Sequence, residues 1–328
     1  MKLQSILLPY GLFLGPMAGY SDHAMRQMCR KMGAEMTVTE MVSAKAICFG
    51  DSKTSLLSRV FFDETPTALQ LFGHECDILS EATRKVEGGE AGYARPSAID
   101  INMGCPMKKI ISGGDGGALM KSPLQIEALV KAVALSTSLP VTVKIRAGWD
   151  EDHINATECA KAAEAGGAQM VCVHGRTVKQ VYSGKANWAV IGAVKGAVSI
   201  PVVGNGDILS GEDALRMKQE TGCDGIMVAR GAIGNPFLFR EIHAALAGEP
   251  YTPPTITERV ETALSQLRQA CLETSEHHAI PASRGQIAAY VFGLRGAADV
   301  RRRVNCAKTY AEVEDILLGF ARQSSEEN

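Results

Sequence analysis

The sequence predicts a (β/α)₈ barrel followed by a small helical domain. Short apolar runs alternate with longer amphipathic stretches between residues 12 and 247. Eight of these runs are strand-like, and eight strands separated by helices match the repeat of a (β/α)₈ barrel. After a Gly/Pro-containing break, the apolar residues of the C-terminal part recur at helical spacing only.

The expected strands are runs of apolar and β-compatible residues. They are Leu12–Ala18, Met36–Glu40, Thr67–Phe72, Ala98–Asn102, Val141–Ile145, Met170–His174, Val202–Gly204 and Gly225–Ala229. Residues 41–65 read as a long loop or a short helix. A doubly wound open sheet is the structural alternative. That fold usually has a glycine-rich turn after its first strand, where this chain has Pro-Met-Ala-Gly-Tyr at residues 16–20.

The helices between the strands show a 3.6-residue period and recognisable ends. Pro123–Ser136 begins after the N-cap residue Ser122, Asn155–Ala165 stops at two glycines, and Ser210–Glu220 ends near Gly222. We expect three parts: a catalytic barrel at residues 1–247, a linker at 248–254 and a helical domain at 255–328. Within that domain the expected helices are Thr257–Glu276, Arg284–Gly293 and Tyr310–Ala321.

Composition narrows the class of protein. The 328 residues carry a formal net charge of −2, so an anionic partner would have to meet a local basic patch. The longest apolar runs are too short for a membrane span or a signal peptide. The nine cysteines form no CxxC pair, which disfavours zinc-finger and thioredoxin-like chemistry. These features are typical of a cytoplasmic protein.

Cys105 is the strongest candidate for a catalytic side chain. The run Ile-Asp-Ile-Asn-Met-Gly-Cys-Pro-Met at residues 99–107 takes a strand directly into a glycine-rich loop. Pro106 restricts Cys105 to extended geometry, and active sites lie at such strand ends. A single cysteine is more often a small buried hydrophobe, and the other eight are expected to be structural.

Polar residues stand at almost every expected strand end, which is hard to explain by packing alone. Asn205-Gly206-Asp207 and Ala229-Arg230-Gly231 offer backbone N–H groups and a guanidinium, as in the phosphate sites after strands seven and eight of barrels. Lys144 lies among apolar neighbours and would balance negative charge on a cofactor ring. Its alternative role is a buried ion pair with Asp100. His174, followed by Gly-Arg-Thr, is expected to contact a ligand.

These residues together resemble the tRNA-dihydrouridine synthases, and the order and spacing are most similar to the bacterial B-type branch. The segments that carry the resemblance are Pro16-Met17-Ala18-Gly19 with Asp22, Thr39-Glu40-Met41, Gln70-Leu71-Phe72-Gly73, Asp100–Pro106, Lys144-Ile145-Arg146, His174–Thr177 and Asn205-Gly206-Asp207. The similarity covers the whole barrel and, more loosely, the helical tail.

The resemblance implies an FMN-binding barrel that reduces the C5–C6 bond of particular uridines in tRNA, with NADPH as reductant. It implies Cys105 as the general acid. The implied FMN contacts are Pro16, Met17, Ala18, Gln70, Lys144, Asn205, Gly206, Asp207, Ala229 and Arg230, with His174 added. Asn102 and the cations Arg146, Arg176, Lys108 and Lys109 are expected at the mouth, where they would bind the RNA. It implies no metal ion, membrane or protein partner.

The helical tail departs from the family pattern. B-type members usually carry an Arg-Lys-His run and then an aromatic pair, where this chain has Arg284-Gly285-Gln286 and then Tyr290. The following segment 294–308 is basic, and we expect Arg301, Arg302 and Arg303 to bind RNA phosphates. Its alternative role is an ordinary solvated helix face.

Three other functions remain open from sequence. The first is an FMN-barrel oxidoreductase of the dihydroorotate or dihydropyrimidine dehydrogenase type, which would not need a basic helical tail. The second is a dihydrouridine synthase that acts on rRNA. The third is a non-enzymatic RNA-binding regulator, which the intact polar strand ends disfavour.

Overall fold

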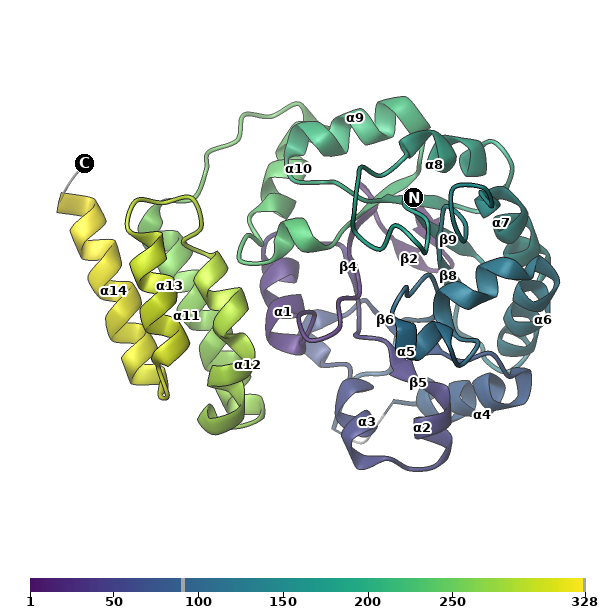
Figure 1. The fold of residues 1–328 in the computed structure, drawn as a ribbon, viewed down its shortest axis with the longest axis horizontal. Helices are drawn as coiled ribbons and strands as arrows, with labels where there is room; N and C mark the ends of the chain where they lie inside the picture. The colour runs from purple at the N-terminus through teal and green to yellow at the C-terminus, as the bar shows by residue number, and fades with distance from the viewer. Residues whose placement is uncertain (90–91, 327–328) are drawn as a thin grey trace.

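The computed structural model, which describes residues 1–89 and 92–326, confirms the (β/α)₈ barrel (Figure 1). Its strands are β3 (Leu12–Leu14), β4 (Met36–Val38), β6 (Thr67–Phe72), β7 (Ala98–Met103), β8 (Val141–Arg146), β9 (Met170–His174), β10 (Val202–Asn205) and β11 (Gly225–Val228). All neighbouring pairs are parallel, and β11 closes the ring on β3 through the pair Met227 and Phe13. The carboxyl ends of the strands therefore meet at one mouth.

Helices cover the outside of the ring and bury apolar stripes against it. They are α1 (His23–Lys31), α4 (Cys76–Glu87), α6 (Pro123–Ala134), α7 (Ala156–Ala165), α8 (Trp188–Lys195), α9 (Gly211–Thr221) and α10 (Leu238–Ala247). The side chain of Ser122 caps α6, as the sequence predicts, and the side chain of Ser210 caps α9 instead of starting it. Residues 41–65 form the short strand β5 (Val42–Ser43), helices α2 (Ala44–Cys48) and α3 (Ser52–Leu57), and a 3₁₀ turn at Phe62–Glu64.

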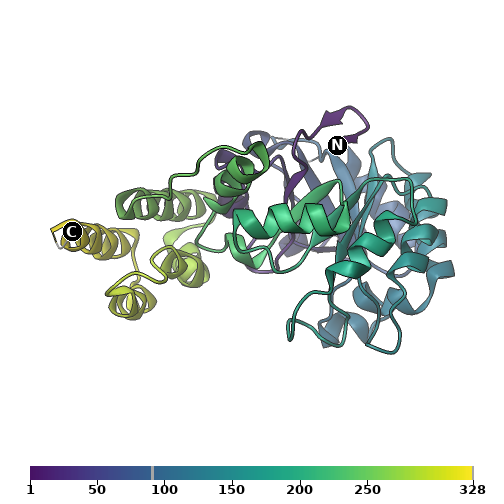
Figure 2. The same cartoon turned by 90° about the horizontal axis from the view of Figure 1, so that it is seen from above.

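The amino end of the barrel is closed by a hairpin of β1 (Lys2–Leu3) and β2 (Ile6–Leu7). In Figure 2 this hairpin projects at one end of the barrel, near the N-terminus. Leu3 and Leu8 are buried against the interior side chains Phe13 and Met36. This apolar layer fills the lower half of the barrel and leaves polar side chains for the mouth.

The C-terminal region is helical, as expected, but its boundaries differ. It consists of α11 (Ile256–Glu273), α12 (Glu276–Ala289), α13 (Ala297–Cys306) and α14 (Tyr310–Glu326). The prediction that the second helix begins at Arg284 is wrong, because α12 starts earlier and runs through Pro281. The exposed Pro281 lies in the second turn, close to the helix start. The basic segment forms α13, a helix of its own. The division into domains at residues 248–254 stays a prediction.

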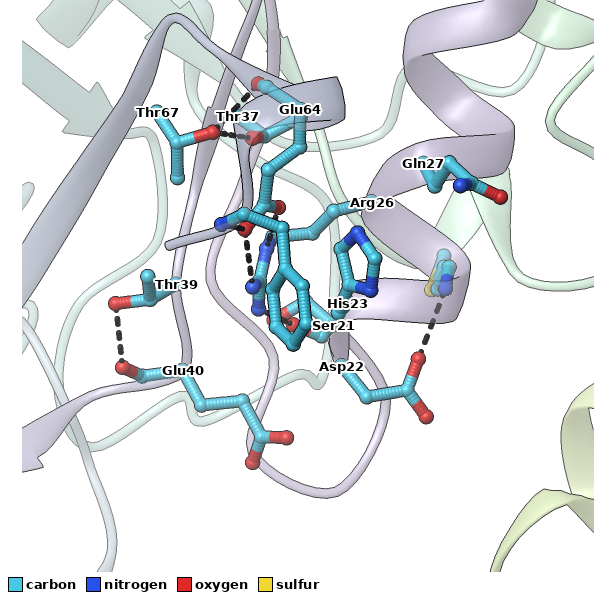
Figure 3. A network of polar contacts seen from close by, with 12 residues as sticks. Ser21, Asp22, His23, Arg26, Gln27, Thr37, Thr39, Glu40, Glu64 and Thr67 are labelled. Carbon is cyan, nitrogen blue, oxygen red and sulfur yellow. Dashed lines mark hydrogen bonds and ion pairs between the residues drawn. The ribbon is translucent and has the colours of Figure 1, made fainter. Parts of the chain in front are cut away.

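A buried polar network around α1 joins the helical region to the barrel, and Figure 3 shows its barrel side, with His23, Arg26 and Glu64. His23 on α1 is 5% exposed and bonds two carboxylates, Glu273 of α11 through Nδ1 and Asp63 through Nε2 at 2.8 Å. The Phe61 ring stacks on its imidazole at a centroid distance of 3.7 Å. Beside it, Arg26 forms a bidentate ion pair with the fully buried Glu64. This buried pair holds α1 to the 3₁₀ turn within the barrel, whereas the bond from His23 to Glu273 makes the contact with α11.

A second contact explains the residue that stands in place of the family's histidine. Gln286 of α12 is 2% exposed and donates through Nε2 to Asp22 Oδ2 at 3.4 Å. Its Oε1 accepts from Gln266 Nε2 at 2.6 Å, and the buried Tyr290 hydroxyl donates to Gln266 Oε1 at 2.6 Å. The departure at this position therefore builds a neutral contact with α1.

Among the described helices, none is long and apolar enough to cross a membrane.

Candidate active site

A cavity of about 690 Å³ opens at the mouth of the barrel. Its wall brings together the predicted residues from seven strand ends: Pro16, Met17, Ala18, Gln70, Asn102, Cys105, Lys144, Arg146, His174, Asn205, Gly206, Asp207, Ala229 and Arg230. The parallel register explains this convergence, because each of these side chains lies at or just beyond the carboxyl end of its strand. The cavity is a single compartment that holds acids, cations and amides side by side.

Cys105 lies on the cavity wall in the loop after β7. Asn102 Oδ1 accepts the backbone N–H groups of Cys105 at 2.9 Å and of Gly104 at 3.2 Å. On the other side of the loop, the Gly117 N–H donates to the Cys105 carbonyl at 3.0 Å. Burial raises the pKa of the Cys105 thiol, although Arg146 and Lys144 lower it in part. The thiol therefore keeps its proton at neutral pH, which an acid must do.

Lys144 is a cation held inside the barrel. Its ammonium donates to Asn205 Oδ1 at 2.9 Å, and Asn205 Nδ2 donates in turn to the Met227 carbonyl at 2.8 Å. Burial lowers the pKa of Lys144, and the charge of Arg146 lowers it further. The alternative partner, Asp100, instead accepts from Gln70 and Thr142. The Lys144 charge is therefore oriented toward the cavity side of the barrel, where an anionic ring would stabilise it.

His174 stands among cations and stays neutral. Burial lowers the pKa of its imidazole, and Lys144, Arg146, Arg176 and Arg230 lower it further. Arg176 Nη1 lies 3.4 Å from Nε2, so Nε2 accepts and the ring proton sits on Nδ1. A neutral imidazole with one N–H donor can bond a phosphate or a carbonyl oxygen without adding charge.

Two glycines of the cavity wall pack too closely against neighbouring protein atoms to carry a side chain. A Cβ on Gly206, whose φ is +118°, would lie 2.8 Å from the Ala186 Cβ. A Cβ on Gly231 would lie 2.3 Å from the Ile208 carbonyl oxygen. Between them Asp207 adopts a φ of +58°, a conformation that non-glycine residues rarely take. This strained turn presents backbone groups where a phosphate would sit.

Arg146 and Arg176, the two arginines expected to bind RNA at the mouth, lie in different surroundings. Arg146 lines the cavity, but Nε donates to the Gly104 carbonyl and Nη1 to the Thr177 and Val181 carbonyls. Arg176 is 2% exposed and pairs with Asp207 at 2.8 Å beneath the following loop. That position differs from the surface position expected, because the loop folds over its guanidinium.

The remaining expected cations lie outside the cavity. Lys108 and Lys109 are exposed on the short helix α5 (Lys108–Ile111), which follows Cys105. Arg301, Arg302 and Arg303 are exposed on α13, away from the mouth (Figure 1). Asp299 pairs with Arg302 at 2.5 Å and with Arg303 at 3.9 Å. RNA binding by these residues stays a prediction.

Sequence reasoning missed Tyr182, an aromatic side chain at the cavity mouth. It is 51% exposed, and its ring lies 4.7 Å from the Arg230 guanidinium and 5.7 Å from that of Arg146. Tyr182 belongs to a loop without periodic pattern, so only its residue type could have marked it. An exposed aromatic ring flanked by two arginines is suited to stacking on a planar ligand.

Among the described residues, no group of three His, Cys, Asp or Glu could hold a metal ion.

Comparison with known proteins decides the family. The sequence profile described as dihydrouridine synthase matches residues 13–325. The chain belongs to the dihydrouridine synthase family. It is 38% identical to the "Probable tRNA-dihydrouridine synthase" of Treponema pallidum, over 97% of this chain and 95% of that protein. It is also 38% identical to the "tRNA-dihydrouridine synthase B" of Pseudomonas aeruginosa, over 99% of this chain and 97% of that protein.

The resemblance stated from the sequence, including the B-type branch, is thereby confirmed. As a member of this family, the dihydrouridine synthase described here is an oxidoreductase that acts on a CH–CH bond. Solved structures support its fold alone. An old yellow enzyme homologue from Zymomonas mobilis has a TM-score of 0.51 at 12% identity, covering 79% of this chain and 94% of that chain. Histamine dehydrogenase from Rhizobium gives 0.54 at 14%, covering 82% and 50%.

Proposed function

We propose that this dihydrouridine synthase reduces the C5–C6 double bond of specific uridines in tRNA, with FMN as cofactor and NADPH as reductant. One observation supports it above the others: a proton-bearing thiol, Cys105, and a buried cation, Lys144, share one cavity wall. Reduction of an activated double bond needs an acid for one carbon and a charge that favours transfer to the other.

The residues fit FMN by their chemistry. The turn at Gly206 and Asp207, with Arg230 and Gly231, lines the cavity and would offer backbone groups and a guanidinium to a monophosphate. Gln70 and Lys144 lie on the same wall, where they would hold a polar ring edge. When bound, FMN supplies the transfer of hydride from NADPH to C6 of the base. A flavin without a monophosphate would leave the turn at Gly206 without a ligand.

The remaining steps belong to the chain's own side chains. The target uridine has to leave its base stack to enter a cavity of this depth. Asn102, Arg146 and the exposed ring of Tyr182 surround the entrance and would orient the base. Lys144 would stabilise the negative charge of the reduced cofactor ring before transfer. Cys105 would then donate its thiol proton to C5 of the base, where negative charge has developed, and regain a proton from water.

The cofactor is tested by the colour and the identity of the released group. Purified protein is expected to show flavin absorbance bands, and denaturation is expected to release FMN. Release of FAD, or failure to bind any flavin on reconstitution, would contradict the proposal. The reduced protein is then mixed with tRNA, with rRNA or with free pyrimidines, and reoxidation of the flavin is measured. Reoxidation by tRNA alone supports the proposal. Reoxidation by free pyrimidines would indicate a pyrimidine dehydrogenase, and reoxidation by rRNA an rRNA-modifying enzyme.

The acid is tested by Cys105→Ala, with Cys76→Ala as a control because Cys76 starts α4 outside the cavity. We expect Cys105→Ala to retain flavin and NADPH oxidation while tRNA reduction falls about 10²- to 10⁴-fold, the usual contribution of a general acid. The control is expected to behave as wild type. Dihydrouridine formation near the wild-type rate in Cys105→Ala would remove the thiol from the mechanism.

A further inference from the structure

Asp100 is a buried carboxylate below the floor of the cavity that the mechanism above leaves unused. It lies in the middle of β7 and is 3% exposed. In the barrel register it stands directly between Gln70 of β6 and Thr142 of β8. Asn102, two residues further along β7, belongs to the layer above, since alternate residues of a strand share one face. Asp100 is therefore placed to act on the cavity through its neighbours.

A chain of hydrogen bonds runs from the Asp100 carboxylate through Gln70 and Asn102 to the loop that carries Cys105; we call it the relay. Gln70 Nε2 donates to Asp100 Oδ2 at 2.6 Å, and Thr142 Oγ1 donates to Oδ1. With its amide so oriented, Gln70 turns Oε1 toward Asn102 and accepts from Nδ2 at 2.8 Å. Asn102 Oδ1 is then free to accept the backbone N–H groups of the next loop, those of Gly104 and Cys105.

The direction of this relay follows from the carboxylate, because an ionised carboxyl group only accepts hydrogen bonds. An amide can face either way, so the direction is set by the two ends, where Asp100 accepts and the Gly104 and Cys105 N–H groups donate. If both amides reversed, Asn102 Nδ2 would face two N–H donors. Each buried donor left unsatisfied costs about 1–3 kcal/mol. The acceptor at Asp100 therefore decides whether Asn102 can accept the backbone N–H groups of Gly104 and Cys105.

The other side of the loop is also fixed, so a change in the relay acts on the position of Cys105. A Cβ on Gly116 would lie 3.0 Å from the Cys105 Cβ, which shows how closely the two segments pack. Burial raises the pKa of Asp100, whereas the bonds from Gln70 and Thr142 and the charge of Lys144 lower it. These three partners are the groups that keep an acceptor at this position.

We propose that Asp100 is a positioning residue: its carboxylate sets the direction of the hydrogen bonds through Gln70 and Asn102 and so anchors the loop that carries Cys105. The inference rests on the proposed function only in the role it gives to Cys105. It deepens that function because the position of the Cys105 thiol in the cavity then depends on Asp100, a residue that does not itself contact the substrate.

Alkylation of the folded protein by iodoacetamide, followed by peptide mass spectrometry, measures the exposure and reactivity of each cysteine. We expect Asp100→Asn to make Cys105 react about two- to tenfold faster, the equivalent of one hydrogen bond. The buried Cys29, Cys159 and Cys172 report global loosening and are expected to keep their wild-type rates. The matched control is Thr142→Val, which removes one donor to Asp100 while the Gln70 bond and the Lys144 charge still favour an acceptor there.

A double variant distinguishes positioning from bulk stability. In Asp100→Asn with Asn102→Asp the carboxylate moves to the other end of the relay, and every donor finds an acceptor once Gln70 reverses. Cys105 alkylation is expected to return to the wild-type rate or below it, because the relocated charge disfavours the thiolate. The proposal fails if the double variant stays as reactive as Asp100→Asn or does not fold, or if Thr142→Val and the buried cysteines change as much as Cys105.

Turnover supplies a separate readout. Asp100→Asn is expected to slow tRNA-dependent reoxidation and to retain NADPH oxidation, since the relay ends at the acid. Alkylation does not require turnover, so the two proposals fail independently. If wild-type protein does not reduce tRNA, the proposed function is wrong while the alkylation result still decides the relay.

Discussion

His23→Ala removes the cation that joins α1 to α11, and we expect it to destabilise the protein by about 3 kcal/mol near pH 6. The bond from Nδ1 to Glu273, whose side chain is 19% exposed, contributes most, as charge-assisted bonds give about 1.5–3 kcal/mol. Asp63 is 48% exposed, so its bond is screened and contributes about 0.5 kcal/mol. Loss of the stack with Phe61 adds about 1 kcal/mol.

The effect depends on pH in a direction that the structure fixes. Burial lowers the pKa of His23, but the bonds and charges of Glu273, Glu64 and Asp63 raise it more, so the net pKa lies above its ordinary value. Because the folded pKa exceeds the unfolded one, the charge-dependent stabilisation is complete below the unfolded value. It is lost as pH rises through the folded value, and only the contribution of the stack persists.

Thermal unfolding of wild type and variant between about pH 6 and pH 9 measures this difference. A loss of 3 kcal/mol corresponds to a fall in Tm of about 4 °C for a chain of this size. His277→Ala is the control, because His277 is exposed on α12. A difference between wild type and His23→Ala that stays constant over this pH range would refute the reasoning, since an uncharged histidine would then explain the stability.

Three further predictions concern the helical region and the cavity. Replacing Arg301–Arg303 by Gln should weaken tRNA binding and lower its salt slope by about 1 to 2, because Asp299 already neutralises part of this charge; an unchanged slope moves the RNA site elsewhere. Gly231→Ala should cost about 1–3 kcal/mol and release flavin during gel filtration, because its Cβ meets the Ile208 carbonyl. Lys144→Met should lower the flavin midpoint potential measured by dye equilibration, because the anionic reduced ring loses a cation; an unchanged potential contradicts that role.

The barrel was predictable because its signal repeats. Each strand is a short apolar run, and the polar residue at its end has to lie at the mouth once the strands are parallel. For this reason the structure places Cys105, Lys144 and Asn205 on one cavity wall, as the sequence indicates. The start of α12 was not predictable in the same way, because Pro281 lies inside the helix, where a proline ordinarily indicates a break.

Contacts across the barrel were also beyond sequence reasoning. The relay from Asp100 to Asn102 through Gln70 depends on the register between strands that are about thirty residues apart in sequence. Arg176 lies two residues after His174, yet the loop that covers it is aperiodic, so neither its burial nor the exposure of Tyr182 could be read from a pattern. Sequence located the strand ends, and the structure added which side chains bond one another.

The hairpin that plugs the amino end of the barrel has a consequence for the order of events during turnover. With Leu3 and Leu8 packed into the lower half, the described part of the barrel admits molecules only from the carboxyl end of its strands. Under the proposed function, NADPH and a flipped uridine would both have to enter through this mouth and would exclude each other from it. One has to depart before the other arrives, so double-reciprocal plots at varied reductant concentration should form parallel lines, and each reactant should inhibit competitively when in excess.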